Sequence, residues 1–502
     1  MSVPVLLVTW MGFMHPLRKL DFWWHLKVGE IILTSRAIPQ VDLFSFTRAG
    51  QPFIHQSWLG ELLYYLAYQA GGFPLLIAFS TGLLLLAFTP IYHLCLETDS
   101  PLRAAILCSL VAAFMLGLYG STRPQTYSFI FFAAFYWILW QYREGQHDYL
   151  WVLPLLMLLW VNLHGAFVLG IGMIGIVLGA ETARRLVRGP RADTLTPRAL
   201  AKLTLVLGLT VLATMANPQT YRVFAYVRQL QVDAASQTFV KEWQVPDITT
   251  FSGVLLFYGP FFLLVLTSIY TRRRLNLTEL GLFLTFAVLA LAAIRSGIWF
   301  ALIVTPILAR HVTELTIPNL LNDRVRGQPR LDPQPHPVER QTESKHSTHN
   351  RLNWTILVCL VLFTVMLSPW VRPHLEVGPW NRQLVEQGTP VGVMDYIADY
   401  KLEGNVFHTQ DYGDYLIWRL WPQQRSFIDG RVHLYDEATV RDYISVFHDD
   451  NWESRIAKYD IEYLLLPKDD QKTESMIKRA RGSTNWTLRY EDEISILFEK
   501  QP

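Results

Sequence analysis

Charged residues are scarce in this chain. Asp, Glu, Lys and Arg make up 17% of its 502 residues, against roughly 25% in typical soluble proteins. The sequence has 3 cysteines; all lie in apolar segments, so the large polar C-terminal region does not depend on disulfides. The formal net charge is only +2, and the arginines gather in short loops, so nothing indicates a nucleic-acid partner. These absences argue against an ordinary soluble enzyme and against a disulfide-stabilised secreted domain.

Long apolar runs dominate instead. Hydrophobic residues make up 51% of the chain, and Phe73–Tyr92 and Phe251–Tyr270 reach the roughly 20 residues that a spanning helix needs. Val3–Met14 is too short to span unaided and lacks the features of a secretory signal. We interpret it as a thin or truncated first transmembrane helix. We predict about eleven transmembrane helices, at 3–14, 74–94, 102–120, 124–142, 150–164, 165–183, 201–216, 251–270, 277–294, 296–311 and 353–371.

Three basic segments predict the orientation of these helices. Ala183–Lys202, Thr271–Arg274 and Arg310–Arg351 are rich in arginine or lysine, and the positive-inside rule places such loops in the cytoplasm. Counting helices alternately from these anchors places the remaining loops on the outer face: 15–73, 120–124, the turn near 164, 217–250, the turn near 295, and 372–502. The protein is therefore expected to be a multi-pass membrane protein whose C-terminal region lies on the outer face.

The chain divides into a bundle and a distal domain. We assign residues 1–316 to the transmembrane bundle, 317–352 to a disordered cytoplasmic linker, 353–371 to a last transmembrane helix and 372–502 to an extracytoplasmic domain. Alternating patterns in this last region predict helices at Val391–Tyr400 and Tyr412–Leu420, and strands at Asn405–His408, Ser426–Asp429, Ile461–Leu466 and Ile494–Glu499. The predicted fold class is mainly α, a polytopic transmembrane bundle with a small C-terminal α/β domain.

Most polar residues of the predicted bundle fall at its outer face, which favours chemistry at that surface. Asp21 stands at the outer end of the first predicted helix, before the amphipathic segment Phe22–Ser35. A partly desolvated carboxylate there can act as a general base; the alternative is a helix-end cap in water. His25 lies one turn later on the same helical face. It could bind phosphate or tune Asp21, or be an ordinary amphipathic residue of the interface.

Two isolated arginines occupy the outer face, where positive charge is disfavoured. Arg123 lies in a very short turn, and Arg295 lies between two apolar helices at the same level. Both could clamp a lipid phosphate or pyrophosphate, because the planar guanidinium suits that group. The alternative is that they snorkel to the lipid headgroups.

Further candidates lie in the first outer loop. Asp42 and His55 are candidate acceptor-site residues, with structural roles in the loop as the alternative. A second amphipathic segment, Ser57–Ala70, carries Glu61, which we expect on its solvated face.

The other outer segments add fewer candidates. His164 follows Asn162 at the end of an apolar helix, where the two form either part of a site or a buried hydrogen-bonded structural pair. Glu242 lies in the long outer loop 217–250. In the distal domain, a polar cluster forms either a packed α/β edge or an acceptor-recognition surface: Asp411, Asp414, Trp418, Asp429 and Arg431.

Several motifs resemble a group of bacterial integral-membrane proteins. They are Leu20–Leu26 (LDFWWHL), with Asp-x-x-Trp-His in the first outer loop, His55–Leu59 (HQSWL), Trp160–Gly165 (WVNLHG), Ala216–Pro218 (ANP), Tyr412–Trp418 (YGDYLIW) and Phe427–Arg431 (FIDGR). This group is assigned to the GT-C superfamily of glycosyltransferases, which use polyprenyl-phosphate-linked sugars. The resemblance implies a catalytic carboxylate just after the first helix, where Asp21 stands. It also implies that the loop bearing Glu242 closes over the donor.

The resemblance implies an inverting membrane glycosyltransferase at the outer face. It would move a sugar from a polyprenyl-phosphate donor to a lipid-linked glycan, a polysaccharide or a protein. Phe22 follows Asp21 where some superfamily members have an acidic pair, so we predict no metal site and treat a divalent metal as optional. One alternative is a non-catalytic accessory protein of surface-polysaccharide assembly or export. A transporter is disfavoured because the predicted helices have almost no ionisable residue near the midplane.

Overall fold

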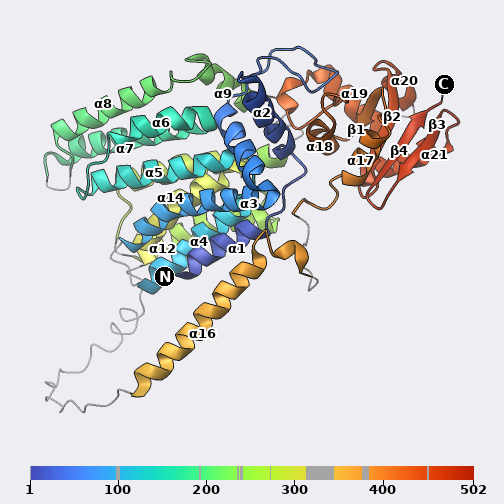
Figure 1. Ribbon diagram of the computed structural model, residues 1–502. Coiled ribbons are helices and arrows are strands. Elements are labelled where there is room, and N and C mark those ends of the chain that lie inside the picture. The colour runs from blue at the N-terminus through green and yellow to red at the C-terminus, as the bar shows by residue number, and fades with distance from the viewer. Residues whose placement is uncertain are drawn as a thin grey trace, which may run out of the picture.

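The computed structural model describes residues 2–97, 102–191, 194–233, 237, 241–271, 273–312, 344–375, 384–448 and 451–501. The chain is mainly helical, with one small sheet at the C-terminal end (Figure 1). The bundle contains α1 (Ser2–Met14), α3 (Trp58–Leu96), α4 (Leu102–Tyr119), α5 (Gln125–Arg143), α6 (Val152–Leu163), α7 (Phe167–Arg188), α8 (Pro197–Ala213), α12 (Gly259–Tyr270), α13 (Leu277–Ala292) and α14 (Gly297–Val312). Each overlaps a segment predicted as a transmembrane helix.

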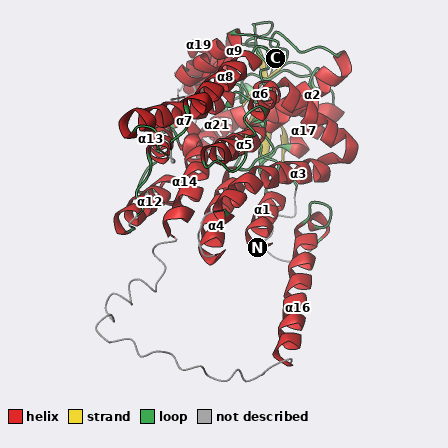
Figure 2. Cartoon of the chain, turned by 90° about the vertical axis from the view of Figure 1, so that its left-hand side faces the viewer, coloured by secondary structure: helices red, strands yellow, loops and turns green. Residues whose placement is uncertain are grey.

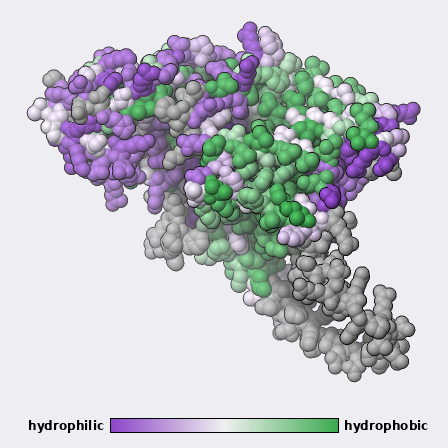
Figure 3. Space-filling view, turned by 180° about the vertical axis from the view of Figure 1, so that it is seen from behind, coloured by the Kyte–Doolittle hydropathy of each residue, from purple (hydrophilic) through white to green (hydrophobic). Residues whose placement is uncertain are grey.

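Two of the described helices, α3 and α7, are long and apolar enough to cross a membrane by length and composition. Shorter apolar helices accompany them, including α1, α6, α12 and α13. Hydrophobic side chains cover much of the visible bundle surface, whereas the C-terminal domain is largely hydrophilic (Figure 3). The exposed apolar residues of the bundle include Leu155 of α6 and Leu212 of α8, at 63% and 64%. Such a surface suits contact with lipid tails.

Helix α3 joins two segments that are predicted as separate helices, Ser57–Ala70 and 74–94. Its backbone leaves the helical conformation at Gly71 and Gly72, and Gly72 has φ 62° and ψ −159°. Only glycine adopts this conformation readily, because it lacks a Cβ atom. The break separates the amphipathic part that begins at Trp58 from the apolar part that follows. It thereby places Glu61 near the outer loops.

Short elements at one end of the bundle complete it. They are α2 (Phe22–Ser35), α9 (Arg222–Val232), η1 (Lys241–Trp243), α11 (Phe251–Gly253), η2 (Val254–Tyr258) and η3 (Ile294–Ser296). Helix α2 begins and ends at its predicted bounds, whereas α9 is absent from the predictions. Helix α9 has an apolar side that buries Val223 and Val227.

Helix α16 (Ser344–Leu367) stands apart from most of the bundle (Figures 1 and 2). Its contact with α1 includes a hydrogen bond from Trp10 Nε1 to Thr364 Oγ1 of 2.8 Å. The predicted linker 317–352 lies mostly outside the described residues, and its last residues, from Ser344, belong to α16. After α16, a short 3-10 turn, η5 (Arg372–His374), precedes the C-terminal domain.

The C-terminal domain is a small α/β domain. Its strands, β1 (Asn405–His408), β2 (Ile461–Pro467), β3 (Trp486–Glu491) and β4 (Ser495–Lys500), form one sheet in the order β1-β2-β4-β3. Strand β1 is parallel to β2, and the other two pairs are antiparallel. The surrounding helical elements are α17 (Val391–Asp399), α18 (Gln410–Leu420), η6 (Val432–Leu434), α19 (Glu437–His448), α20 (Trp452–Ala457) and α21 (Gln471–Gly482).

One predicted strand, Ser426–Asp429, is wrong. Ser426 forms only an isolated parallel bridge, with Ser45 of the first outer loop. Its N–H donates to Phe44 O at 2.8 Å, and its carbonyl accepts from Phe46 N–H at 3.0 Å. The apolar pair within 426–429 therefore packs in the domain core, while the backbone pairs with the outer loop instead of the sheet.

The first outer loop and the C-terminal domain are packed together. Trp23 of α2 contacts Tyr415 of α18 edge-to-face, with ring centroids 4.7 Å apart. Leu17, just before α2, forms a parallel bridge with Val385. The segments before and within α2 thus lie against residues more than 350 positions later in the chain. This packing positions the site.

Candidate active site

A cavity of about 660 Å³ lies where the outer-loop end of the bundle meets the C-terminal domain. Its wall comes from loops and helix ends that are distant in sequence. It includes every predicted site residue except Asp42: Asp21, His25, His55, Arg123, His164, Glu242 and Arg295. The short segment Gly430–His433 of the C-terminal domain closes one side. Asp21, Arg123 and Arg295, which lie far apart in the sequence, therefore converge on one cavity.

Asp21 is held at this wall by the C-terminal domain. Its backbone has φ 59° and ψ −45°, a strained conformation for a residue with a side chain. The Asp21 N–H donates to Asp414 Oδ2 at 2.6 Å, and Asp414 Oδ1 accepts from Gly430 N–H at 2.8 Å. A Cβ atom on Gly430 would lie 2.4 Å from Asp21 Oδ1. Asp414 therefore ties Asp21 to Gly430, whose lack of a Cβ atom leaves room for the Asp21 carboxylate.

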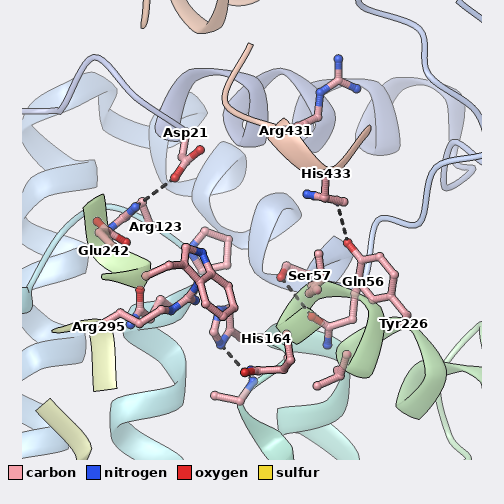
Figure 4. Close-up of a pocket in the computed structure, with 18 of the residues that line it drawn as sticks. Asp21, Gln56, Ser57, Arg123, His164, Tyr226, Glu242, Arg295, Arg431 and His433 are labelled. Atoms are coloured by element: carbon pink, nitrogen blue, oxygen red, sulfur yellow. Dashed lines mark hydrogen bonds and ion pairs between the residues drawn. The ribbon is translucent and has the colours of Figure 1, made fainter. Parts of the chain in front are cut away.

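Arg123 bridges two carboxylates of the cavity wall (Figure 4). Its Nη1 donates to Asp21 Oδ2 at 2.9 Å and its Nη2 donates to Glu242 Oε1 at 3.0 Å. Burial lowers the pKa of Arg123, but Glu242 and Asp21 outweigh it and the pKa is raised. Burial raises the pKa of the Asp21 carboxyl above its usual range, although Arg123 opposes this rise. Asp21 is therefore a stronger base than an exposed aspartate.

Arg295 is the second arginine of the cavity wall. Its guanidinium lies over the Trp243 ring, 4.4 Å from the centroid. Among the described residues, Arg295 has no hydrogen bond or salt bridge to a side chain. Burial lowers its pKa, while Glu242 opposes that change. A stacked guanidinium whose N–H groups face a cavity is suited to an anionic group, and phosphate matches its planar donors.

Two histidines and Glu61 form a cluster in the cavity wall. His25 Nδ1 lies 2.7 Å from Glu61 Oε1, and His55 Nδ1 lies 3.8 Å from Glu61 Oε2. Glu61 is 1% exposed, so the expectation that it lies on a solvated face is wrong. The break in α3 turns this part of the helix toward the first outer loop. Burial lowers the pKa of His25 well below its usual range and that of His55 to about 3.

His164 and Asn162 do not form a pair with each other. His164 Nδ1 is 2.9 Å from Ser128 Oγ, and Asn162 Oδ1 accepts from Trp58 Nε1 at 2.9 Å. The His164 ring lines the cavity as a hydrogen-bonding group.

Asp42 lies outside the cavity wall, contrary to its prediction as an acceptor-site residue. It is 2% exposed, and its Oδ1 accepts from Arg431 Nη1 at 2.6 Å. Arg431 also donates from Nη2 to Asp429 Oδ2 at 2.6 Å. The carboxylate of Asp42 thus neutralises a buried arginine and joins the first outer loop to the C-terminal domain.

The opposite half of the cavity wall has neutral polar groups that the sequence analysis does not single out. Tyr226 Oη of α9 and His433 Nε2 lie 3.3 Å apart, near Gln56 and Ser57 (Figure 4). We call Gln56, Ser57, Tyr226 and His433 the neutral half, and Asp21, Arg123, Glu242 and Arg295 the charged half. Within the neutral half, only Gln56 and Ser57 belong to a motif noted in the sequence, HQSWL.

No cluster of three or more His, Cys, Asp or Glu side chains suited to a metal ion occurs within the described part of the chain. The acidic groups of the charged half, Asp21 and Glu242, are instead separated by Arg123. This arrangement provides a carboxylate beside guanidinium groups.

Comparisons with known proteins identify the architecture. No family model matches the chain, and no curated protein matches its sequence. Among solved structures, it is similar to the archaeal oligosaccharyltransferase AglB from Archaeoglobus fulgidus in complex with an inhibitory peptide and a dolichol-phosphate. The TM-score is 0.56 at 13% identity, covering 100% of this chain and 74% of that one. The chain has a GT-C-like fold.

A second structure supports the same conclusion. The Archaeoglobus fulgidus oligosaccharyltransferase tethered with an acceptor peptide matches with a TM-score of 0.54 and 12% identity, over 100% of this chain and 74% of that one. The resemblance to GT-C proteins drawn from the sequence is thereby confirmed at the level of fold. Within this GT-C-like fold, Asp21 precedes α2, Arg123 precedes α5 and Arg295 precedes α14. Helix ends thus bring the charged half together.

Proposed function

We propose that the protein is a membrane glycosyltransferase that uses a polyprenyl-phosphate-linked sugar. One observation carries the proposal: Asp21 and Arg295 face one cavity in a GT-C-like fold. A base and a phosphate-binding cation are the two groups that such a transfer needs. The structurally similar oligosaccharyltransferase was solved with a dolichol-phosphate, which is a ligand of the same chemical class.

The reaction would be a single displacement. The acceptor hydroxyl oxygen attacks the anomeric carbon, a new carbon–oxygen bond forms and the bond to the phosphate oxygen breaks, with inversion. The hydroxyl proton passes to the Asp21 carboxylate. The electron pair of the broken bond stays on the polyprenyl phosphate, whose charge Arg295 stabilises. Because Arg123 already binds Asp21 and Glu242, its first task is to orient the base.

The remaining candidates would contact the substrates. We propose that His25, His55 and His164 donate or accept hydrogen bonds, His25 and His55 as neutral rings because burial lowers their pKa values. Glu242 would position the donor loop through Arg123. Acceptors of the proposed reaction are a lipid-linked glycan, a polysaccharide or a protein. A divalent metal is optional in this scheme, because the phosphate leaving group departs readily.

The proposal includes a placement in the membrane. Residues 1–316 would form the bundle and 353–371 the last of about eleven spanning helices, joined by a cytoplasmic linker at 317–352. The cavity and the domain at 372–502 would then lie at the outer face of a bacterial cytoplasmic membrane.

The test is glycan transfer by the purified protein in nanodiscs, supplied with a pool of polyprenyl-phosphate sugars. Mass spectrometry measures the released polyprenyl phosphate. Asp21→Asn should reduce transfer by about 10²- to 10⁴-fold. Asp395→Asn is the matched control, because that carboxylate is 46% exposed and pairs with Arg419 away from the cavity. Equal activity in both variants would contradict the role of Asp21, and polyprenyl-phosphate binding without turnover would favour the accessory protein.

A further inference from the structure

The neutral half has no free charge among the lining residues that the structure describes. Arg431 lies on this side of the cavity, but its side chain is 0% exposed and pairs with Asp42 and Asp429. Burial lowers the pKa of His55 to about 3 and that of His433 to about 4. Both rings are therefore neutral near pH 7. The side chains that reach the cavity here are hydroxyl, imidazole and carboxamide groups.

Glu61 also lines the cavity next to this half, beside His25 and His55. It is 1% exposed, with its Oε1 2.7 Å from His25 Nδ1. Burial raises the pKa of the Glu61 carboxyl well above its usual range, which favours its uncharged form. A sugar ammonium group would find no exposed anion in the neutral half, and a sugar carboxylate would find no free cation.

The neutral groups are arranged to exchange hydrogen bonds with hydroxyls. Tyr226 Oη lies 3.3 Å from His433 Nε2, a long contact that leaves both groups able to bond a ligand. Gln56 Nε2 donates to Val161 O at 2.8 Å, which fixes the carboxamide beside Ser57. The Phe53 ring stacks on His433 with centroids 5.4 Å apart. Fixed donors and acceptors next to an aromatic ring are suited to the hydroxyls and apolar face of a sugar.

We infer that the neutral half binds the ring of an uncharged sugar, with Tyr226, His433 and Gln56 contacting its hydroxyls. The inference rests on the proposed function and names its substrate class. Uronic acids and sugars with a free ammonium group are excluded from this half, because each would lose its hydration without gaining an opposite charge. The sugar belongs either to the donor or to the acceptor glycan, and the two share this chemistry.

Binding to the full-length protein in nanodiscs tests the inference. The probes are undecaprenyl phosphate, its glucose, mannose and galactose derivatives, and its glucuronate derivative. At least one hexose derivative should bind at least tenfold more tightly than undecaprenyl phosphate. The glucuronate derivative should show no such gain in affinity. Tyr226→Phe removes one hydrogen bond and should reduce that preference about fivefold, while binding of undecaprenyl phosphate is unchanged. Tyr400→Phe is the matched control, since Tyr400 is 67% exposed.

Two further arms separate the possible outcomes. If the sugar belongs to the acceptor, neutral oligosaccharides without lipid bind in a Tyr226-dependent way, and the hexose lipids show no preference. Arg295→Gln should weaken the binding of undecaprenyl phosphate. Unchanged binding would contradict the proposed function but not the inference about the neutral half. Tightest binding of the glucuronate derivative would overturn the inference. The inference would also be overturned if Tyr226→Phe changed the binding of none of the sugars, whether or not the variant changed the binding of undecaprenyl phosphate.

Discussion

Arg431→Met should destabilise the junction between the first outer loop and the C-terminal domain. The guanidinium of Arg431 is fully buried and donates to Asp42 at 2.6 Å and to Asp429 at 2.9 and 2.6 Å. Methionine fills a similar volume but leaves both carboxylates without their cation. Removing one partner of a buried ion pair typically costs about 3–5 kcal/mol.

The expected loss is visible in thermal unfolding. At about 2–4 °C per kcal/mol, the midpoint measured by intrinsic fluorescence in detergent should fall by about 6–20 °C. Arg441→Met is the matched control, because Arg441 and its partner Glu437 are 71% and 85% exposed. An exposed pair of this kind contributes under about 1 kcal/mol. Adding Asp42→Asn to Arg431→Met should restore part of the loss, because one orphaned charge is removed.

Equal midpoints for Arg431→Met and Arg441→Met would refute this reasoning. So would a loss that Asp42→Asn deepens, because the cost would then come from packing and not from unpaired charge. If the reasoning holds, limited proteolysis of Arg431→Met should also cut within the first outer loop sooner than in the wild type. That loop contains Asp42 and is joined to the domain through Arg431.

Two further predictions concern the charged half. Arg123→Gln removes the cation that lowers the pKa of Asp21, so burial raises that pKa further. A base is lost as pH falls through its pKa, so the acidic limb of the pH–rate profile should move to higher pH; an unmoved limb would mean that another group is the base. Gly430→Ala places a Cβ atom 2.4 Å from Asp21 Oδ1 and should reduce transfer tenfold or more with little change in the unfolding midpoint. Normal turnover by this variant would show that the position of Asp21 is not critical.

The sequence predicts the helices and the face on which the charged half lies. Apolar length and the position of basic loops are local signals, so they place Asp21, Arg123 and Arg295 at helix ends on one face without any knowledge of packing. Their meeting in one cavity follows, because several helix ends share a face. The resemblance of the LDFWWHL and YGDYLIW motifs to GT-C proteins points to the same architecture.

The residues of the neutral half and the pairing of Asp42 with Arg431 could not be predicted in this way. Tyr226 and His433 lie 207 residues apart, and Asp42 and Arg431 lie 389 apart. Such pairs depend on tertiary packing, which leaves no periodic signal along the chain. Likewise, Ser426–Asp429 has the composition of a strand, but its partner is the first outer loop and not the sheet.

The hydrogen bond between Asp21 and Asp414 has a consequence for how the protein is made. The two residues lie 393 positions apart, which a ribosome covers in roughly 20 to 80 s. During that time, the nascent chain contains Asp21 without Asp414, Gly430 or His433. The wall of the cavity is complete only when the later-translated C-terminal domain has packed against the first outer loop. Shorter nascent chains therefore carry the Asp21 carboxylate but lack one side of the cavity.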